Sequence, residues 1–258
     1  MKIIGLIPAA GHATRLGPLF TGSKELIPIN HSVTPPRVAC EYLLLQMREA
    51  GIEHALMVIR DSKRDIPAFL NDGRDVGVSL TYVVTTATAG VPYTIDRAYT
   101  QLHDAVITLG FPDILVEDSG CLARLVHAYR ARPVDLGLGL FPLADPETMD
   151  AVEVNDRRVT RVIPKPGPTS LTHTWAFAVW RATFTEFMHQ WLAQTDSRTQ
   201  SSREIFVGDV IQAAIDAGLD IEGTAVSNQP FLDVGTPHGL ADARRRFGRR
   251  QLRPLHAG

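Results

Sequence analysis

The sequence has few cysteines, no long apolar run and little net charge, and each shortage excludes a class of protein. Its two cysteines, Cys40 and Cys121, provide neither a disulfide framework nor the spacing of zinc ligands. No stretch approaches the roughly 18 consecutive apolar residues of a membrane span. A formal net charge of -2 favours neither nucleic acid nor a membrane surface as a partner. We therefore expect a cytoplasmic protein that binds no nucleic acid and no membrane.

Internal repeats, low-complexity linkers and the G-x-G-x-x-G spacing of dinucleotide-binding folds are also missing. The absence of that glycine spacing argues against a nicotinamide-dependent dehydrogenase. The 45% apolar and 21% charged composition is that of an ordinary globular protein. A single domain at 1–243 with a basic C-terminal tail at 244–258 is the simplest organisation for this length.

Apolar strands alternate with helices along the first half of the chain. The run KIIGLIP at 2–8 is typical of a strand that is buried on both faces. Further strands are predicted at 54–59, 79–84, 105–109 and 135–141. Helices are predicted at 38–50, 65–70, 92–102 and 120–130. This order predicts an α/β fold, a Rossmann-like three-layer sandwich with a mostly parallel mixed sheet.

The pattern changes after about residue 142. Two apolar segments flank Asn155-Asp156-Arg157 as the strands of a hairpin would, which predicts a small antiparallel elaboration in the second half. A loop rich in Ser, Thr and Gln is expected at 194–202. The remaining predicted elements are strands at 175–180, near 223–226 and near 231–233, a helix at 205–217, and a helical tail from 239.

Small residues follow the first predicted strand in the segment PAAGHATRL, and SKELIPI comes shortly after it. The backbone N–H groups of such a loop can hold phosphate oxygens. Arg15 and Lys24 would add two positive charges that could stabilise a triphosphate and its leaving pyrophosphate. On local chemistry alone, a turn of small residues with two solvated cations explains this segment equally well.

The segments AAGHATRL and SKELIPI resemble the signature loop of the sugar nucleotidyltransferases, the family of the glucose-1-phosphate thymidylyl- and uridylyltransferases. Other segments resemble those of the family in the same order: AGIEHALMVI, NDGRDVGVSLTYV, TLGFPDIL, RVTRVIPKPG, REIFVGDVIQAAIDAG and FLDVGTPHGLADA. The resemblance covers roughly residues 2–243. It implies an enzyme of nucleotide-sugar biosynthesis that condenses an NTP or dNTP with a sugar 1-phosphate and releases pyrophosphate.

The resemblance also implies a metal site and two catalytic cations. Asp113 and Asp233 match two carboxylates that hold a Mg²⁺ ion, a role that suits hard oxygen ligands. Arg15 and Lys24 match the cations of the catalytic loop. Taken singly, Asp113 could instead be a turn residue after a proline, and Asp233 could be a strand-end cap.

Four further positions match substrate-binding residues of the family. Ala10 and Gly11 belong to the loop that holds the triphosphate, and Gly90 belongs to the base-recognition segment. Lys165 matches the lysine that binds the sugar phosphate. A solvated hairpin lysine is the alternative for Lys165.

Several positions depart from the family pattern. Ala13 replaces a loop glycine, and Ile163-Pro164 stands where an acidic pair usually helps to hold the sugar. In the family's metal-binding turn an Asp directly follows a Gly. The corresponding segment here, the metal turn, is Gly110-Phe111-Pro112-Asp113, in which two residues separate Gly110 from Asp113. Thr85 stands where the family commonly has a glutamine. A single hydroxyl group cannot form the same hydrogen bonds to a nucleobase as an amide group. The base and the sugar therefore stay open.

Two other functions also stay open. A cytidylyltransferase could act on a non-sugar phosphate such as phosphocholine. A nucleotide-binding regulatory protein without catalysis would bind nucleotide tightly and release no pyrophosphate. Oligomers are common in the family, which implies a homo-oligomer of undetermined size, and we expect no second acyltransferase or β-helix domain.

Overall fold

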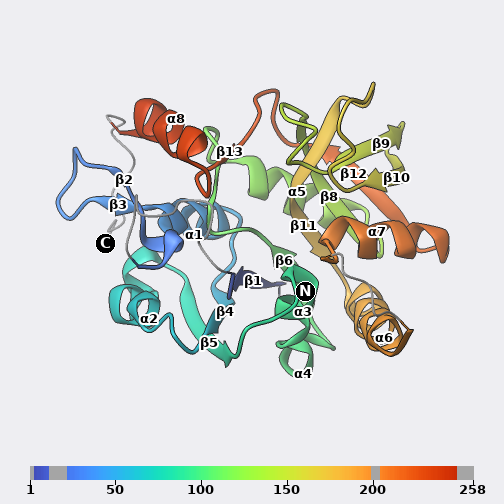
Figure 1. The fold of residues 1–258 in the computed structure, drawn as a ribbon, viewed down its shortest axis with the longest axis horizontal. Coiled ribbons are helices and arrows are strands. Elements are labelled where there is room, and N and C mark those ends of the chain that lie inside the picture. The colour runs from blue at the N-terminus through green and yellow to red at the C-terminus, as the bar shows by residue number, and fades with distance from the viewer. Residues whose placement is uncertain (1–2, 12–21, 199–203, 249–258) are drawn as a thin grey trace.

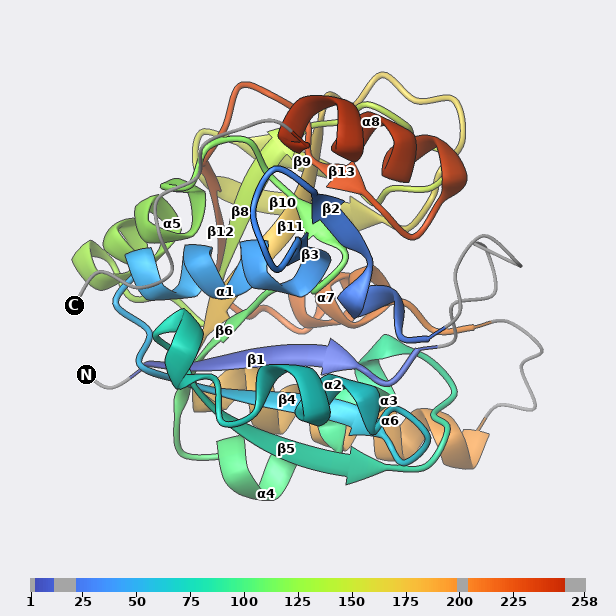
Figure 2. The same ribbon diagram turned by 90° about the vertical axis from the view of Figure 1, so that its left-hand side faces the viewer.

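The structure is a computed structural model that describes residues 3–11, 22–198 and 204–248. Within these residues nine strands form one mixed sheet, and helices cover both of its faces (Figures 1 and 2). This three-layer α/β arrangement confirms the fold class that the sequence predicts.

The central sheet contains most of the predicted strands. In sheet order they are β5 (Ser79–Thr85), β4 (His54–Arg60), β1 (Ile3–Ala9), β6 (Val106–Leu109), β11 (His173–Trp180), β8 (Leu136–Pro142), β12 (Ile221–Ala225), β10 (Arg158–Ile163) and β9 (Ala151–Asn155). The first four run parallel, and β8 and β12 form another parallel pair. β11 lies antiparallel between β6 and β8, and β9 and β10 form the predicted hairpin. Within the central sheet every antiparallel pairing thus involves a strand from the second half of the chain, which agrees with the predicted antiparallel elaboration.

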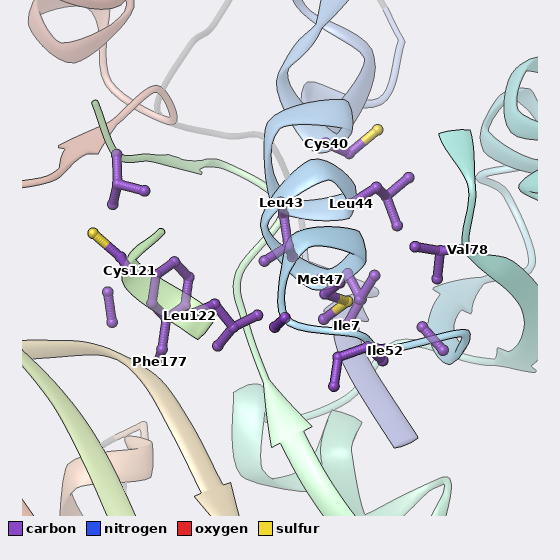
Figure 3. Packing of buried hydrophobic residues seen from close by; sticks show 14 of the residues in the cluster. Ile7, Cys40, Leu43, Leu44, Met47, Ile52, Val78, Cys121, Leu122 and Phe177 are labelled. Carbon is purple, nitrogen blue, oxygen red and sulfur yellow. The ribbon is translucent and has the colours of Figure 1, made fainter. Parts of the chain in front are cut away.

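One face of the sheet is covered by α1 (Ala39–Glu49), α2 (Asp65–Leu70) and α5 (Cys121–Ala131). Leu43 and Met47, one helical turn apart on α1, are buried with Ile7 of β1. Leu122 of α5 and Phe177 of β11 belong to the same cluster (Figure 3). Each such side chain contributes roughly 1.5–3 kcal/mol when it is fully buried. This helix layer supports the sheet whose strand ends carry the loops of the site.

The other face is covered by α3 (Val91–Asp96), α4 (Tyr99–Leu102), α6 (Ala182–Arg198) and α7 (Val207–Asp216). The helix expected at 92–102 is divided into α3 and α4, because Ala98 N–H bonds to the Ile95 carbonyl and tightens the turn. Helix α6 is missing from the sequence prediction, although Phe184, Met188 and Leu192 repeat every four residues and are buried. The loop expected at 194–202 is also wrong over 194–198, which belong to α6.

A third cluster lies under α8 (Pro237–Phe247), away from the central sheet. Near it lie two small two-stranded sheets, made of β2 (Pro28–Asn30) with β3 (Arg37–Val38) and β7 (Ile114–Leu115) with β13 (Leu232–Asp233). Phe247 is buried in this cluster, so the boundary expected at 243 falls inside a packed helix. Among the described residues, no helix is both long and apolar enough to cross a bilayer.

Candidate functional site

Most of the predicted site residues that the structure describes follow strands of the parallel half of the sheet. Because β1, β5 and β6 run parallel, the loops after them leave the same edge. Ala10 and Gly11 follow β1, Gly90 follows β5, and the loop of Gly110 follows β6. The Gly110 N–H donates to the Leu6 carbonyl at 3.2 Å, which keeps the first and third loops adjacent. A Cβ atom built on Gly11 would meet nothing within 4 Å among the described atoms.

The two predicted metal ligands are neighbours at a small two-stranded sheet, of which the sequence predicted the strand near 231–233 but not its partner β7. β7 and β13 pair antiparallel, and Asp233 lies opposite Ile114. The Val234 N–H donates to the Asp113 carbonyl at 3.0 Å, which fixes the two segments side by side. One Asp233 oxygen accepts the Gly235 N–H at 2.8 Å. The two-residue offset at the metal turn therefore still leaves Asp113 beside Asp233.

Lys24 completes this cluster. Its ammonium forms an ion pair with the Asp113 carboxylate, and both side chains are largely buried. Burial opposes the charged form, but the carboxylates of Asp113, Glu25 and Asp233 outweigh it and raise the pKa of Lys24 above its ordinary value. Lys24 is therefore a permanent cation beside two carboxylates, which we name the nucleotide-side cluster (Lys24, Asp113 and Asp233).

The residues on both sides of Lys24 are anchored to the turn after β4. Ser23 donates to Asp65 through its N–H, at 2.8 Å, and through its hydroxyl, at 2.7 Å. Glu25 is completely buried, and the Lys63 ammonium donates to both of its carboxylate oxygens at 2.7 and 2.8 Å. These contacts hold Lys24 in place between two fixed neighbours.

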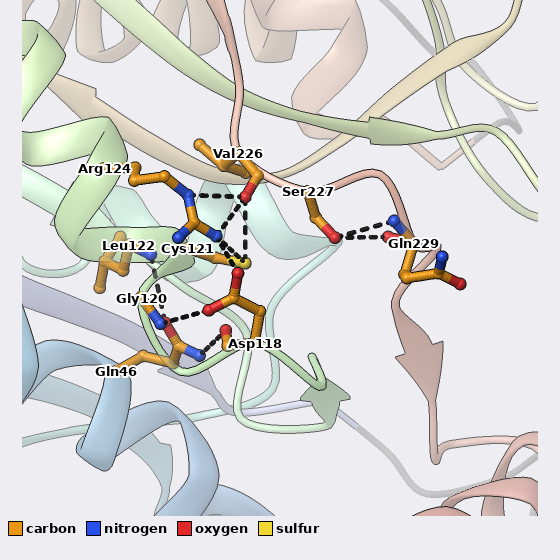
Figure 4. Close-up of polar contacts among 9 residues, drawn as sticks. All are labelled: Gln46, Asp118, Gly120, Cys121, Leu122, Arg124, Val226, Ser227 and Gln229. Atoms are coloured by element: carbon orange, nitrogen blue, oxygen red, sulfur yellow. Dashed lines mark hydrogen bonds and ion pairs between the residues drawn. The ribbon is translucent and has the colours of Figure 1, made fainter.

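A polar network anchors the chain that follows β7 and the chain that leads into β13 (Figure 4). Arg124 of α5 forms an ion pair with Asp118 and donates to the Val226 carbonyl at 3.0 Å through Nε. Gln46 of α1 donates to the Asp118 carbonyl at 2.7 Å. The segments that carry Asp113 and Asp233 are thus tied to the helices of one layer.

Lys165 lies in a second group of polar and aromatic side chains. Its ammonium is 3.7 Å from the centroid of the Phe206 ring, a cation–π contact. Asp150, just before β9, accepts a hydrogen bond from the Trp175 indole at 3.0 Å. The Trp175 ring in turn contacts Phe111 of the metal turn, with centroids 5.7 Å apart. We name Asp150, Lys165, Trp175 and Phe206 the acceptor-side cluster.

The segment 204–208 contacts two predicted binding positions, Gly90 and Lys165. Gly90 has a φ of 149°, and a Cβ built there would lie 2.8 Å from the Ile205 carbonyl oxygen. Lys165 contacts Phe206 in the same segment. A Cβ built on Gly208 would lie 2.6 Å from an Asp150 carboxylate oxygen. This segment therefore lies against both the base-recognition loop and the acceptor-side cluster.

The structure brings Lys24, Asp113 and Asp233 together and places Lys165 in a separate group. Arg15, together with His12 and Ala13, lies outside the described residues. Sequence reasoning missed Asp150, because a single Asp before a predicted strand carries no motif. It also missed the Glu25–Lys63 pair, because Lys63 stands among other charged residues in the segment RDSKRD and no local pattern marks it as buried.

Neither cysteine is suited to nucleophilic chemistry. Burial raises the pKa of the Cys121 thiol to about 11 and that of Cys40 well above its ordinary value. Both side chains are free thiols buried in the layer of α1 and α5. The chemistry of the site therefore depends on charged groups rather than on a thiolate.

Comparison with known proteins gives relatives over nearly the whole chain. The nucleotidyltransferase Agl11 of low-salt glycan biosynthesis from Haloferax volcanii is 25% identical over 244 residues, which is 93% of this chain. A glucose-1-phosphate thymidylyltransferase from Streptomyces griseus is 27% identical over 249 residues. The chain spans 64% of the length of each of these relatives.

Solved structures share the fold. A UDP-glucose pyrophosphorylase from Acinetobacter baumannii superposes with a TM-score of 0.77 at 19% identity, over 99% of this chain and 96% of the other. The family model described as nucleotidyl transferase matches residues 4–249. The chain therefore belongs to the nucleotidyl transferase family.

Proposed function

We propose that this protein condenses a nucleoside triphosphate with a sugar 1-phosphate, giving a nucleotide sugar and pyrophosphate. The observation that carries the proposal is the nucleotide-side cluster, in which a buried cation lies near two carboxylates. Glucose-1-phosphate thymidylyltransferases among the relatives support a sugar 1-phosphate as the acceptor.

Members of this family generally depend on a divalent metal ion, and the residues present fit Mg²⁺. Asp113 and Asp233 offer hard carboxylate oxygens near the same Lys24 ammonium. Within the described ranges no group of three or more His, Cys, Asp or Glu side chains could hold a metal by itself. Two protein carboxylates with phosphate oxygens and water completing the shell are a common arrangement for Mg²⁺ in phosphoryl-transfer enzymes. When bound, the ion would neutralise phosphate charge.

The reaction needs positioned charge more than proton transfer. An oxygen of the sugar phosphate, already an anion, attacks the α-phosphorus, and the bond from that phosphorus to the bridging oxygen of the pyrophosphate breaks. No residue needs to remove a proton from the nucleophile. Lys24 and Arg15 stabilise the charge of the triphosphate, and Lys165 orients the phosphate of the acceptor. Ala10 and Gly11 allow the nucleotide to approach the backbone of the first loop closely, and Gly90, in the base-recognition segment, leaves room for Ile205.

Pyrophosphate release tests the proposal. The purified protein is incubated with Mg²⁺ and each of ATP, CTP, GTP, UTP and dTTP, in combination with a panel of sugar 1-phosphates and phosphocholine. We expect release that requires both a nucleotide and a sugar 1-phosphate. Release with phosphocholine alone among the acceptors would contradict the proposal, and so would tight nucleotide binding without release from any pair.

A further inference from the structure

One carboxylate on the acceptor side is only partly used by the protein. Trp175 donates to one oxygen of Asp150, and no described residue donates to the other. The side chain is half-buried, so it is largely withdrawn from bulk water. A carboxylate in such a place costs free energy unless further donors reach it. The second oxygen of Asp150 is therefore available to a bound ligand.

Lys165 forms no ion pair with Asp150. Within the described residues the Lys165 ammonium makes no ion pair, and it lies on the face of Phe206 instead. The positive and negative groups of the acceptor-side cluster thus remain separate. This is the arrangement that a ligand with a phosphate and a hydrogen-bond donor requires.

The fold makes room for the Asp150 carboxylate. At Gly208, in the first turn of α7, a Cβ would lie 2.6 Å from its Oδ2 and 3.0 Å from Cγ of Pro164. Any side chain at position 208 would therefore displace the carboxylate or the neighbouring proline. Ile163-Pro164, which lacks the acidic side chains common there in the family, lies at the end of the neighbouring strand β10. Asp150 thus supplies a carboxylate where this segment has none.

From this arrangement we infer that Asp150 accepts a hydrogen bond from a hydroxyl group of the acceptor sugar while Lys165 holds its phosphate. The inference rests on the proposed function and adds the residue that recognises a hydroxyl group of the sugar. A quaternary ammonium such as that of phosphocholine fits less well, because recognition of it needs open aromatic faces. Trp175 is 6% exposed, and Lys165 already lies over one face of the Phe206 ring.

The test combines a variant with deoxy sugars. Asp150→Asn keeps an oxygen for the Trp175 hydrogen bond but removes the charge. Wild type and variant are assayed with glucose 1-phosphate and its 2-, 3-, 4- and 6-deoxy analogues, using the nucleotide that the substrate panel selects. Asp156→Asn is the matched control, since it removes the same charge from the exposed hairpin turn at the other end of β9.

We expect Asp150→Asn to lower kcat/KM for glucose 1-phosphate by roughly 10- to 100-fold, as loss of a hydrogen bond to a charged group does. The KM for the nucleotide should not change. One deoxy analogue should lose a similar factor with wild type and almost none with the variant, because the two changes remove the same hydrogen bond. Asp156→Asn should behave as wild type.

Several results would overturn the inference. One is an unchanged kcat/KM for glucose 1-phosphate in Asp150→Asn; another is a penalty for every deoxy analogue that is equal in both proteins. Preferential use of phosphocholine by wild type would show that the acceptor side binds a quaternary ammonium and not a sugar hydroxyl. If wild type releases no pyrophosphate from any pair, the proposed function fails. Calorimetric titration with glucose 1-phosphate in the presence of UTP then decides for Asp150, and equal affinities for wild type and variant would reject its role.

Discussion

The nucleotide-side and acceptor-side clusters hold their charged groups in different ways. On the nucleotide side, Lys24 is paired with Asp113, and Glu25 next to it is paired with Lys63. On the acceptor side, Lys165 lies on an aromatic ring, and Asp150 has one neutral donor. The first cluster is anchored to helices and turns through several ion pairs, whereas the second has charges that the described protein leaves unpaired.

This difference agrees with the chemistry that we propose for each side. A triphosphate carries the same charge whichever base is attached, so a rigid group of paired charges serves any nucleotide. Acceptors differ in their hydroxyl groups, and charged side chains that have no partner within the protein can distinguish them by hydrogen bonding. The comparison leads to predictions that should affect the two sides differently.

The largest effect is expected from removing the nucleotide-side cation. Lys24→Ala should lower kcat by about 10²- to 10³-fold, because the proposed mechanism then loses the buried charge that stabilises the triphosphate. The acceptor KM should change much less. Steady-state kinetics with Arg74→Ala as control check this, since Arg74 is exposed on the surface. A Lys24→Ala enzyme with normal turnover would remove Lys24 from the mechanism.

The next effect concerns the anchor of Lys24. Lys63→Met leaves Glu25 buried without its partner, which should destabilise the protein by about 3–5 kcal/mol. Thermal denaturation should show a decrease in Tm of roughly 6–20 °C. The double variant Glu25→Leu with Lys63→Met should regain much of this loss, because it buries no charge. Equal Tm values for the single and double variants would show that the pair does not anchor the segment.

On the acceptor side, removing a charge should stabilise the protein. Burial raises the pKa of Asp150 to about 6, and Asp209 adds to this, while Trp175 and Lys165 oppose it. Because the folded-state pKa lies above the unfolded value, ionisation destabilises the fold as pH rises from about 4 through 6. Asp150→Asn should therefore be more stable than wild type at pH 8, on the order of 1–3 kcal/mol.

Denaturant titrations at pH 4 and pH 8 measure this difference. The gain of Asp150→Asn should be present at pH 8 and largely absent at pH 4, where the wild-type carboxyl is protonated in the folded state and only partly ionised in the unfolded state. Asp156→Asn should show no such dependence. A variant that is less stable than wild type at pH 8 would indicate that Asp150 is a structural group rather than one reserved for a ligand.

The smallest effect is expected at Gly208. In Gly208→Ala the new methyl group would displace the Asp150 carboxylate, so the acceptor KM should rise roughly three- to tenfold with the nucleotide KM unchanged. In an Asp150→Ala background the same substitution should have less effect. Equal effects in both backgrounds would show that Gly208 acts on the fold and not through Asp150.

The sequence was sufficient for the strands of the parallel half, because strands buried on both faces appear as continuous apolar runs. It missed α6, whose final turns are rich in residues typical of loops. The pairing of Asp113 with Asp233 followed from the family resemblance, but the sheet of β7 and β13 that brings them together is too short to give a periodic signal. Asp150 depends on contacts with Trp175 and Gly208, which are distant in sequence, so no local pattern could predict its role.

Product stoichiometry tests the central claim most directly. Wild type, Lys24→Ala and Asp233→Asn are incubated with Mg²⁺, glucose 1-phosphate and UTP or dTTP, and pyrophosphate and nucleotide sugar are quantified together. The account predicts equal amounts of both products from wild type, only when the acceptor is present, and a severe loss with either variant. Pyrophosphate without nucleotide sugar, or full activity in both variants, would contradict it.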